Sequence, residues 1–147
     1  KKIFEKVGGF DEDIRSGQDT DLMIRLGLNS IIAYNPIITS RYNSLSENNL
    51  SKSEFISDRI KIFNKYTSEE KKKPYLKTYL DLNRFALAIS FKMNKISDCK
   101  SLRMNIDSKN LKQKQNLLLK LPGSVLQFLK NIQTWLIKKN IYKSAHH

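Results

Sequence analysis

Two aspartates and an arginine near the N-terminus have residue types and a spacing that could support chemistry. Asp19 and Asp21 flank Thr20, and Arg25 follows Asp21 by four residues. A carboxylate can act as a general base, and an acid and a base four residues apart on a helix can form an ion pair. The spacing therefore predicts that Asp21 and Arg25 pair with each other. The alternative is that both aspartates only cap a helix start, where free N–H groups favour carboxylates.

Other chemical motifs are not apparent in the sequence. His and Cys residues are too few for a zinc site. No glycine-rich phosphate loop and no Ser-His-Asp set is apparent. The acidic segment over residues 18–21 is therefore the main candidate for chemistry.

The surroundings of this segment follow a recognisable order. A double glycine at residues 8–9 is followed by Phe-Asp-Glu at residues 10–12, by QDTDLMIR over residues 18–25, and by a β-branched segment that ends in Tyr-Asn-Pro. This order resembles the GG-F-D-E … (E/Q)-D-x-D-L-x-x-R signature near the end of the catalytic domain in family 2 glycosyltransferases, which have a GT-A fold. The match covers about residues 4–36, a quarter of the chain.

The resemblance implies an inverting glycosyltransferase in which Asp19 is the catalytic base. Inverting transfer needs a carboxylate that takes the proton of the acceptor hydroxyl while its oxygen attacks the anomeric carbon. Gln18 stands where the family often has Glu, so it can orient the acceptor or the base but carries no charge. Asp21 and Arg25 match the D-L-x-x-R part of the signature, and we expect them to support the loop that carries the base.

The resemblance also implies a nucleotide-sugar donor, a glycan or polyprenyl-linked acceptor, and Mg²⁺ or Mn²⁺ in the intact enzyme. In this family the metal-binding D-x-D and the nucleotide pocket precede the matched segment. We therefore expect the chain to be the C-terminal part of a bacterial enzyme of surface glycan synthesis, inactive and free of metal by itself. Arg41 lies where family members often carry a basic residue near the donor diphosphate and is a candidate contact to it. The alternative for Arg41 is a solvated polar loop.

The predicted elements are mainly helical. Apolar spacing predicts a short helix over residues 20–28. Two β-branched segments, at residues 31–34 and 37–39, flank Asn35-Pro36 and predict a short β-hairpin-like remnant of the GT-A α/β domain. After residue 53, apolar positions recur every three or four residues and predict a bundle of four to five helices. The predicted fold class is mainly α.

Charge divides the chain. The 147 residues carry a formal net charge of +13, with six basic and seven acidic side chains in residues 1–51 and 21 basic and seven acidic ones in residues 52–147. We therefore predict a catalytic remnant over residues 1–51, a basic helical extension over residues 52–143, and a tag remnant over residues 144–147. A positive field attracts polyanions, although a lysine-rich soluble surface is an equal explanation.

The basic helices permit two interpretations. In one they pack together as an appendage with solvated lysines. In the other, one helix, best placed at residues 125–142, lies on the anionic inner leaflet of a cell membrane. No nucleic-acid recognition motif is present, so nucleic acid is not an expected partner.

Location and assembly follow from the same features. No apolar run reaches the ~20 residues that span a bilayer, and the single cysteine is typical of a reducing compartment. We expect a cytoplasmic protein, with the inner face of the membrane as a second location. Apolar residues at 31–38 lead us to expect self-association. The alternative function is an autonomous helical interaction or membrane-surface module without catalysis.

Overall fold

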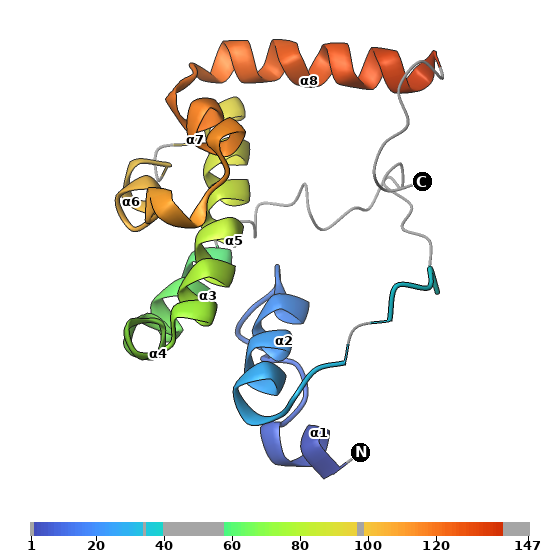
Figure 1. Cartoon of the computed structure of the whole chain (residues 1–147), viewed down its shortest axis with the longest axis vertical. Coiled ribbons are helices and arrows are strands. Elements are labelled where there is room, and N and C mark those ends of the chain that lie inside the picture. The colour runs from blue at the N-terminus through green and yellow to red at the C-terminus, as the bar shows by residue number, and fades with distance from the viewer. Residues whose placement is uncertain (1, 34, 40–57, 97–98, 140–147) are drawn as a thin grey trace. The chain divides into compact units, whose positions relative to one another are not determined.

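The structure, a computed structural model, describes residues 2–33, 35–39, 58–96 and 99–139. These residues form eight α-helices and one 3₁₀ helix, with no strand among them, so the predicted mainly-α class is confirmed (Figure 1). The chain divides into two compact units, Lys1–Lys72 and Lys73–His147. The boundary between the units lies about twenty residues after the point near residue 51 where the charge changes.

The described residues of the first unit form four helices: α1 (Lys2–Val7), α2 (Gln18–Asn29), α3 (Asp58–Lys65) and α4 (Thr67–Lys72). The helix α1 ends at Gly8, whose φ of 80° lies in the left-handed region that glycine adopts without strain. The N–H of Gly8 donates to the carbonyl of Phe4 at 2.9 Å. This glycine turn directs the chain into the loop that precedes α2.

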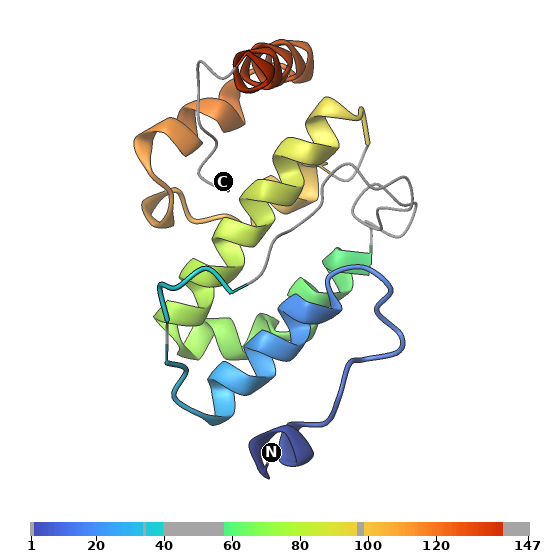
Figure 2. The ribbon, with the colours of Figure 1, turned by 90° about the vertical axis from the view of Figure 1, so that its right-hand side faces the viewer.

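The start of α2 is held by close packing against α3. Gly17, the residue before α2, has a φ of 87°. A Cβ at this glycine would meet the Cδ1 of Ile62 at 3.0 Å and the Cγ of Arg59 at 3.2 Å. Figure 2 shows α2 running beside α3. The buried apolar side chains of this unit are Ile14, Leu22, Ile24, Ile62, Phe63 and Tyr66.

The predicted β-hairpin is not present in the described residues of this segment, which corrects that prediction. Residues 31–33 and 35–39 are irregular, and the Oδ1 of Asn35 accepts the N–H of Ile37 at 3.1 Å, which turns the chain where a strand would be extended. Pro36 has no N–H to donate to a neighbouring strand. A strand also needs a partner for its backbone groups, and no described segment supplies one. Ile31 and Ile38 are consequently 100% and 81% exposed.

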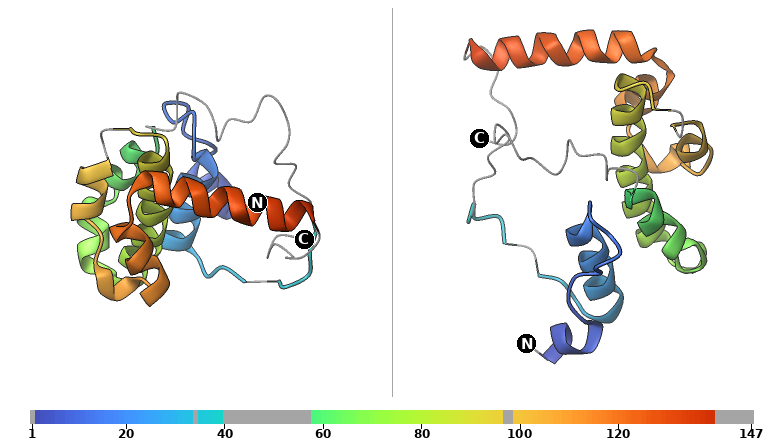
Figure 3. Two further views of the ribbon diagram at one scale, coloured as in Figure 1. Left: turned by 90° about the horizontal axis from the view of Figure 1, so that it is seen from above. Right: turned by 180° about the vertical axis from the view of Figure 1, so that it is seen from behind.

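The second unit contains α5 (Pro74–Met93), α6 (Cys99–Met104), the 3₁₀ helix η3 (Ser108–Asn110), α7 (Gln113–Lys120) and α8 (Gly123–Lys138). The central helix is α5, against which α6, η3, α7 and α8 pack (Figure 3). Its buried apolar side chains are Leu76, Leu80, Leu87, Ala88 and Phe91. Pro74 begins α5, a first-turn position that suits a residue without an N–H.

Six described α-helices follow residue 57, against the predicted four to five. One of the six, α4, has a charged sequence without apolar residues. Glu69 and Glu70 lie in its first turn and Lys71 and Lys72 in its last turn, which is the arrangement that the helix dipole favours. Apolar spacing therefore could not predict this short helix.

A buried carboxylate organises the second unit. The side chain of Asp81 is fully buried and forms ion pairs with Lys77 at 2.5 Å and Arg84 at 3.1 Å. Its Oδ2 accepts the N–H of Asp107 at 3.1 Å and the amide of Asn110 at 2.8 Å. These bonds attach the connection between α6 and η3 to the middle of α5.

A second anchor fixes the turn from α7 to α8. The Nζ of Lys92 donates to the carbonyls of Leu119 and Leu121 at 2.7 and 2.6 Å, which α7 leaves without helical partners. Gly123, the first residue of α8, lies so close to α5 that a Cβ would overlap the carbonyl oxygen of Lys92. The start of α8 is therefore held against the C-terminal end of α5.

Candidate functional site

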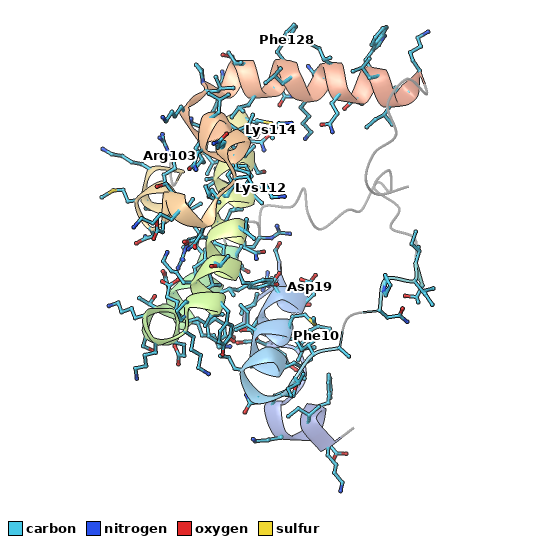
Figure 4. All side chains as sticks on the ribbon, in the orientation of Figure 1. Phe10, Asp19, Arg103, Lys112, Lys114 and Phe128 are labelled. Carbon is cyan, nitrogen blue, oxygen red and sulfur yellow. The ribbon has the colours of Figure 1, made fainter. Side chains whose placement is uncertain are left out.

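The predicted base lies in the first turn of α2. The helix begins at Gln18, two residues before the predicted start, and Asp19 is its second residue. The Asp19 side chain is exposed, and its Oδ1 accepts the N–H of Thr20 at 2.9 Å (Figure 4). Gln18 is half-buried beside it. Asp19 thus presents a carboxylate at a helix N-terminus, where free N–H groups stabilise negative charge.

Asp21 has a different environment. Its side chain is fully buried, and its Oδ2 accepts from the Nε of Arg25 at 2.8 Å, which confirms the predicted ion pair. Its Oδ1 accepts from the hydroxyl of Tyr66 at 2.7 Å and lies 3.0 Å from the Nζ of Lys65. With both oxygens occupied and no exposed surface, Asp21 acts on the site through the residues that it holds.

Arg25 connects this carboxylate to the glycine turn. One terminal nitrogen donates to the carbonyls of Val7 at 2.6 Å and Gly8 at 3.2 Å, and the other donates to the carbonyl of Gly9 at 2.6 Å. These carbonyls lie at the end of α1, where the helix offers them no partner. The double glycine and the Asp21–Arg25 spacing are therefore parts of one structure.

Lys65 extends the network to the loop before α2. Its Nζ lies 2.8 Å from the Oδ2 of Asp11, whose Oδ1 accepts the N–H of Asp13 at 3.1 Å. Lys65 thus joins Asp11 to Asp21. The sequence interpretation missed both Lys65 and Tyr66. The one available signal was the hydroxyl of Tyr66, because a buried tyrosine usually needs a hydrogen-bond partner.

The network sets the charges of its members. Burial raises the pKa of Asp21, but hydrogen bonds from Tyr66, Lys65 and Arg25 outweigh it, so the pKa lies below its ordinary value. Burial lowers the pKa of Lys65, but its bonds to Asp11 and Asp21 outweigh that effect and raise it. Burial and the bond to Asp21 raise the pKa of Tyr66. At neutral pH the carboxylate is charged and the tyrosine is a neutral donor.

These shifts predict how the stability of the first unit depends on pH. The lowered pKa values of Asp11 and Asp21 contribute stability at neutral pH. This stability is lost as the pH falls below about 4 and passes through the lowered pKa values of the folded state. The lowered pKa of Asp58, beside Lys61, contributes to the same loss of stability in acid. The raised pKa of Lys65 contributes stability that is lost as the pH rises above about 10. We therefore expect greatest stability between about pH 5 and 9.

Tyr66→Phe isolates the part of this dependence that belongs to Asp21. The variant removes one donor to the carboxylate, so its pKa rises and the acid unfolding midpoint moves to higher pH. The measurement is acid unfolding of the full chain, monitored through hydrogen exchange of the α2 amides. Tyr75→Phe, at an exposed tyrosine of α5, should leave the midpoint unchanged. Equal midpoints for Tyr66→Phe and the original chain would show that the Tyr66 hydroxyl does not lower the pKa of Asp21.

An open hollow lies between α3 and the loop that precedes α2. It is lined by Glu12, Asp13, Arg15, Asp58 and Lys61. The Oδ2 of Asp58 accepts the N–H of Arg15 at 3.2 Å, and its Oδ1 lies 3.0 Å from the Nζ of Lys61. The mixed charges provide donors and acceptors for a polar ligand and hold the loop on α3.

Metal binding is not supported by these side chains. The described residues contain no group of three or more His, Cys, Asp or Glu side chains that could hold a metal ion. The letters D-x-D at residues 19–21 do not make a metal pair either, because Asp21 is buried and its oxygens are engaged by Arg25, Tyr66 and Lys65. Arg41, the candidate diphosphate contact, lies outside the described residues, as do residues 144–147.

Comparisons with known proteins do not assign a family. No protein-family model, curated protein or solved structure matches the chain. A functional interpretation therefore rests on the sequence pattern and on the geometry of the first unit.

Proposed function

We propose that the first unit is the acceptor-side end of the catalytic domain of an inverting family 2 glycosyltransferase, with Asp19 as the catalytic base. The observation that carries the proposal is the contrast between two neighbouring aspartates. Asp19 is exposed, whereas Asp21 is buried and joined through Arg25 to the glycine turn. The residues that resemble the family signature thus include a carboxylate that can reach a substrate and a network that holds its helix in place.

In the proposed reaction, Asp19 takes the proton of the acceptor hydroxyl as that oxygen attacks the anomeric carbon of the donor sugar. The new glycosidic bond forms on the face opposite the nucleotide, the bond to the diphosphate oxygen breaks, and the nucleotide diphosphate leaves with that electron pair. The amide of Gln18, one residue before the base, would orient the acceptor by hydrogen bonding. We derive no step through Mg²⁺ or Mn²⁺, because the described side chains do not fit a metal.

The surface after α2 supports a larger catalytic domain around this unit. Ile31, Ile32, Ile37 and Ile38 are each at least half exposed. Contiguous exposed apolar residues are typical of surfaces that another segment or protein covers. We propose that these residues pack against the rest of the catalytic domain in the intact enzyme, and that the chain self-associates through them when that domain is absent.

The experiment that tests this proposal compares the chain with the intact enzyme. We expect the intact enzyme to transfer sugar from a nucleotide-sugar donor to a glycan or polyprenyl-linked acceptor, detected by mass spectrometry of the product. We expect the 147-residue chain to bind no nucleoside diphosphate tightly in calorimetry and to hydrolyse no donor. Tight binding or hydrolysis by the chain would contradict the assignment of donor binding to other parts of the enzyme.

A helical interaction module without catalysis is the second candidate function. The observation that favours it lies in the second unit, where α8 exposes several large apolar side chains.

None of the helices in the part of the chain that the structure describes is long and apolar enough to cross a membrane.

A further inference from the structure

One side of α8 is apolar and exposed. Leu126 is the helix's one buried residue. Five large side chains remain 38–62% exposed and recur at intervals of three or four residues, which places them on one side of the helix. We call this set the α8 apolar face; it consists of Val125, Phe128, Leu129, Ile132 and Trp135.

The attachment of α8 leaves this face open within the second unit. The helix is held at its start, where Gly123 meets the backbone of Lys92 and Leu126 is buried. Beyond this point α8 extends past the ends of α5 and α7 (Figures 1 and 3). Figure 4 shows Phe128 projecting on the side of α8 away from α7. The α8 apolar face is therefore a straight, protruding surface and not the wall of a groove.

The charge around α8 has one sign. Residues 108–147 contain eight lysines and no Asp or Glu. On α8 itself, Lys130 and Lys138 are exposed and lie off the α8 apolar face, with Lys139 at the C-cap. A helix with aromatic and aliphatic residues on one side and lysines elsewhere has the composition of helices that lie in a membrane interface.

We propose that α8 is an interfacial helix that lies flat on an anionic bilayer. Its apolar face enters the boundary between head groups and acyl chains, with Phe128 and Trp135 as aromatic anchors. Lys130 and Lys138 lie off this face and attract the anionic surface through their positive charge. This role is independent of whether Asp19 is a base.

Charge complementarity favours a bilayer over two other occupants. A second copy of α8 would bring together two helices of the same positive charge, and residues 108–147 contain no acid that could pair with their lysines. A nucleic acid would contact the lysines through its phosphates, but Phe128 and Ile132 would stay in water. An anionic bilayer is the partner that satisfies both the apolar face and the lysines.

The test uses the full chain with vesicles of phosphatidylcholine, with and without phosphatidylglycerol. Trp135 is the only tryptophan of the chain, so its fluorescence reports on α8 alone. We expect its emission to move to shorter wavelength and its acrylamide quenching to fall when anionic vesicles are added. Flotation should recover the chain with anionic vesicles, and salt should weaken this binding.

Two pairs of variants separate the apolar and charged contributions. Phe128→Glu should lower vesicle partitioning at least about tenfold, whereas Tyr75→Glu, at a tyrosine with the same 62% exposure on α5, should leave it within about twofold of the original chain's. Lys130→Gln with Lys138→Gln should weaken partitioning by on the order of twentyfold, since each lysine near an anionic surface contributes about fivefold. Lys71→Gln with Lys100→Gln changes the net charge equally and should have a smaller effect.

Several results would overturn the proposal. Equal partitioning into neutral and anionic vesicles would contradict the role of the lysines. An unchanged Trp135 emission in anionic vesicles would contradict insertion of the α8 apolar face. A shift that appears without vesicles and grows with protein concentration would identify a second copy as the occupant. A shift produced by single-stranded RNA and absent with vesicles would identify nucleic acid.

Discussion

Replacing Asp21 with alanine is expected to destabilise the first unit by about 3 kcal/mol. Breaking a buried ion pair costs about 3–5 kcal/mol because the remaining charge has lost its partner. The value here lies at the low end, because the side chains of Arg25 and Lys65 are 18% and 39% exposed and water can solvate them in part. The hydroxyl of Tyr66 also loses its acceptor.

The measurement is urea unfolding of the full chain with hydrogen exchange of the α2 and α3 amides. Asp19→Ala is the matched control, because it removes the same group from the same helix at an exposed position. The control loses only a favourable charge at a helix start, which contributes about 0.3–1 kcal/mol. If the two variants had equal unfolding free energies, the buried network would not be the main support of α2.

Replacing Asp19 with asparagine is expected to lower kcat of the intact enzyme about 10²–10⁴-fold, the usual contribution of a general base. Asparagine has nearly the same shape and can still accept the N–H of Thr20, but it cannot take a proton from the acceptor hydroxyl. The KM for the donor should stay within about twofold of the original value, since the base touches the acceptor.

Asp13→Asn is the control for this experiment. Asp13 is an exposed aspartate in the loop before α2, and the same substitution there should change kcat less than about twofold. An equal loss of kcat in both variants would indicate a general effect of charge on the loop. A loss confined to KM would indicate that Asp19 binds substrate without transferring a proton.

The part of the site within one helix could be predicted from the sequence. The pairing of Asp21 and Arg25 follows from their four-residue spacing, which holds on any α-helix. Lys65 and Tyr66 could not be predicted, because 44 and 45 residues separate them from Asp21 and only tertiary packing brings them together. In the second unit the spacing of Lys77 and Asp81 is visible in the same way, but the bonds of Asp81 to Asp107 and Asn110 depend on tertiary packing.

The error in the predicted strands has a physical cause. The β-branched residues near Ile31 and Ile37 have strand propensity, but strand formation depends on a neighbouring strand, which the residue types alone do not supply. The helix α4 contains no apolar residue, so apolar periodicity could not predict it. Long apolar periodicity, as in α5 and α8, was a reliable guide because it requires no partner sequence to be recognised.

The turnover of Asp19→Asn in the intact enzyme, measured on the same sample as its thermal unfolding, tests the role of Asp19 as the base most directly. We expect an unfolding temperature close to that of the original protein together with a kcat lowered at least about a hundredfold. This combination would separate the chemical role of Asp19 from the structural role of Asp21. A kcat within about twofold of the original, in a protein that unfolds at the same temperature, would remove Asp19 from the mechanism.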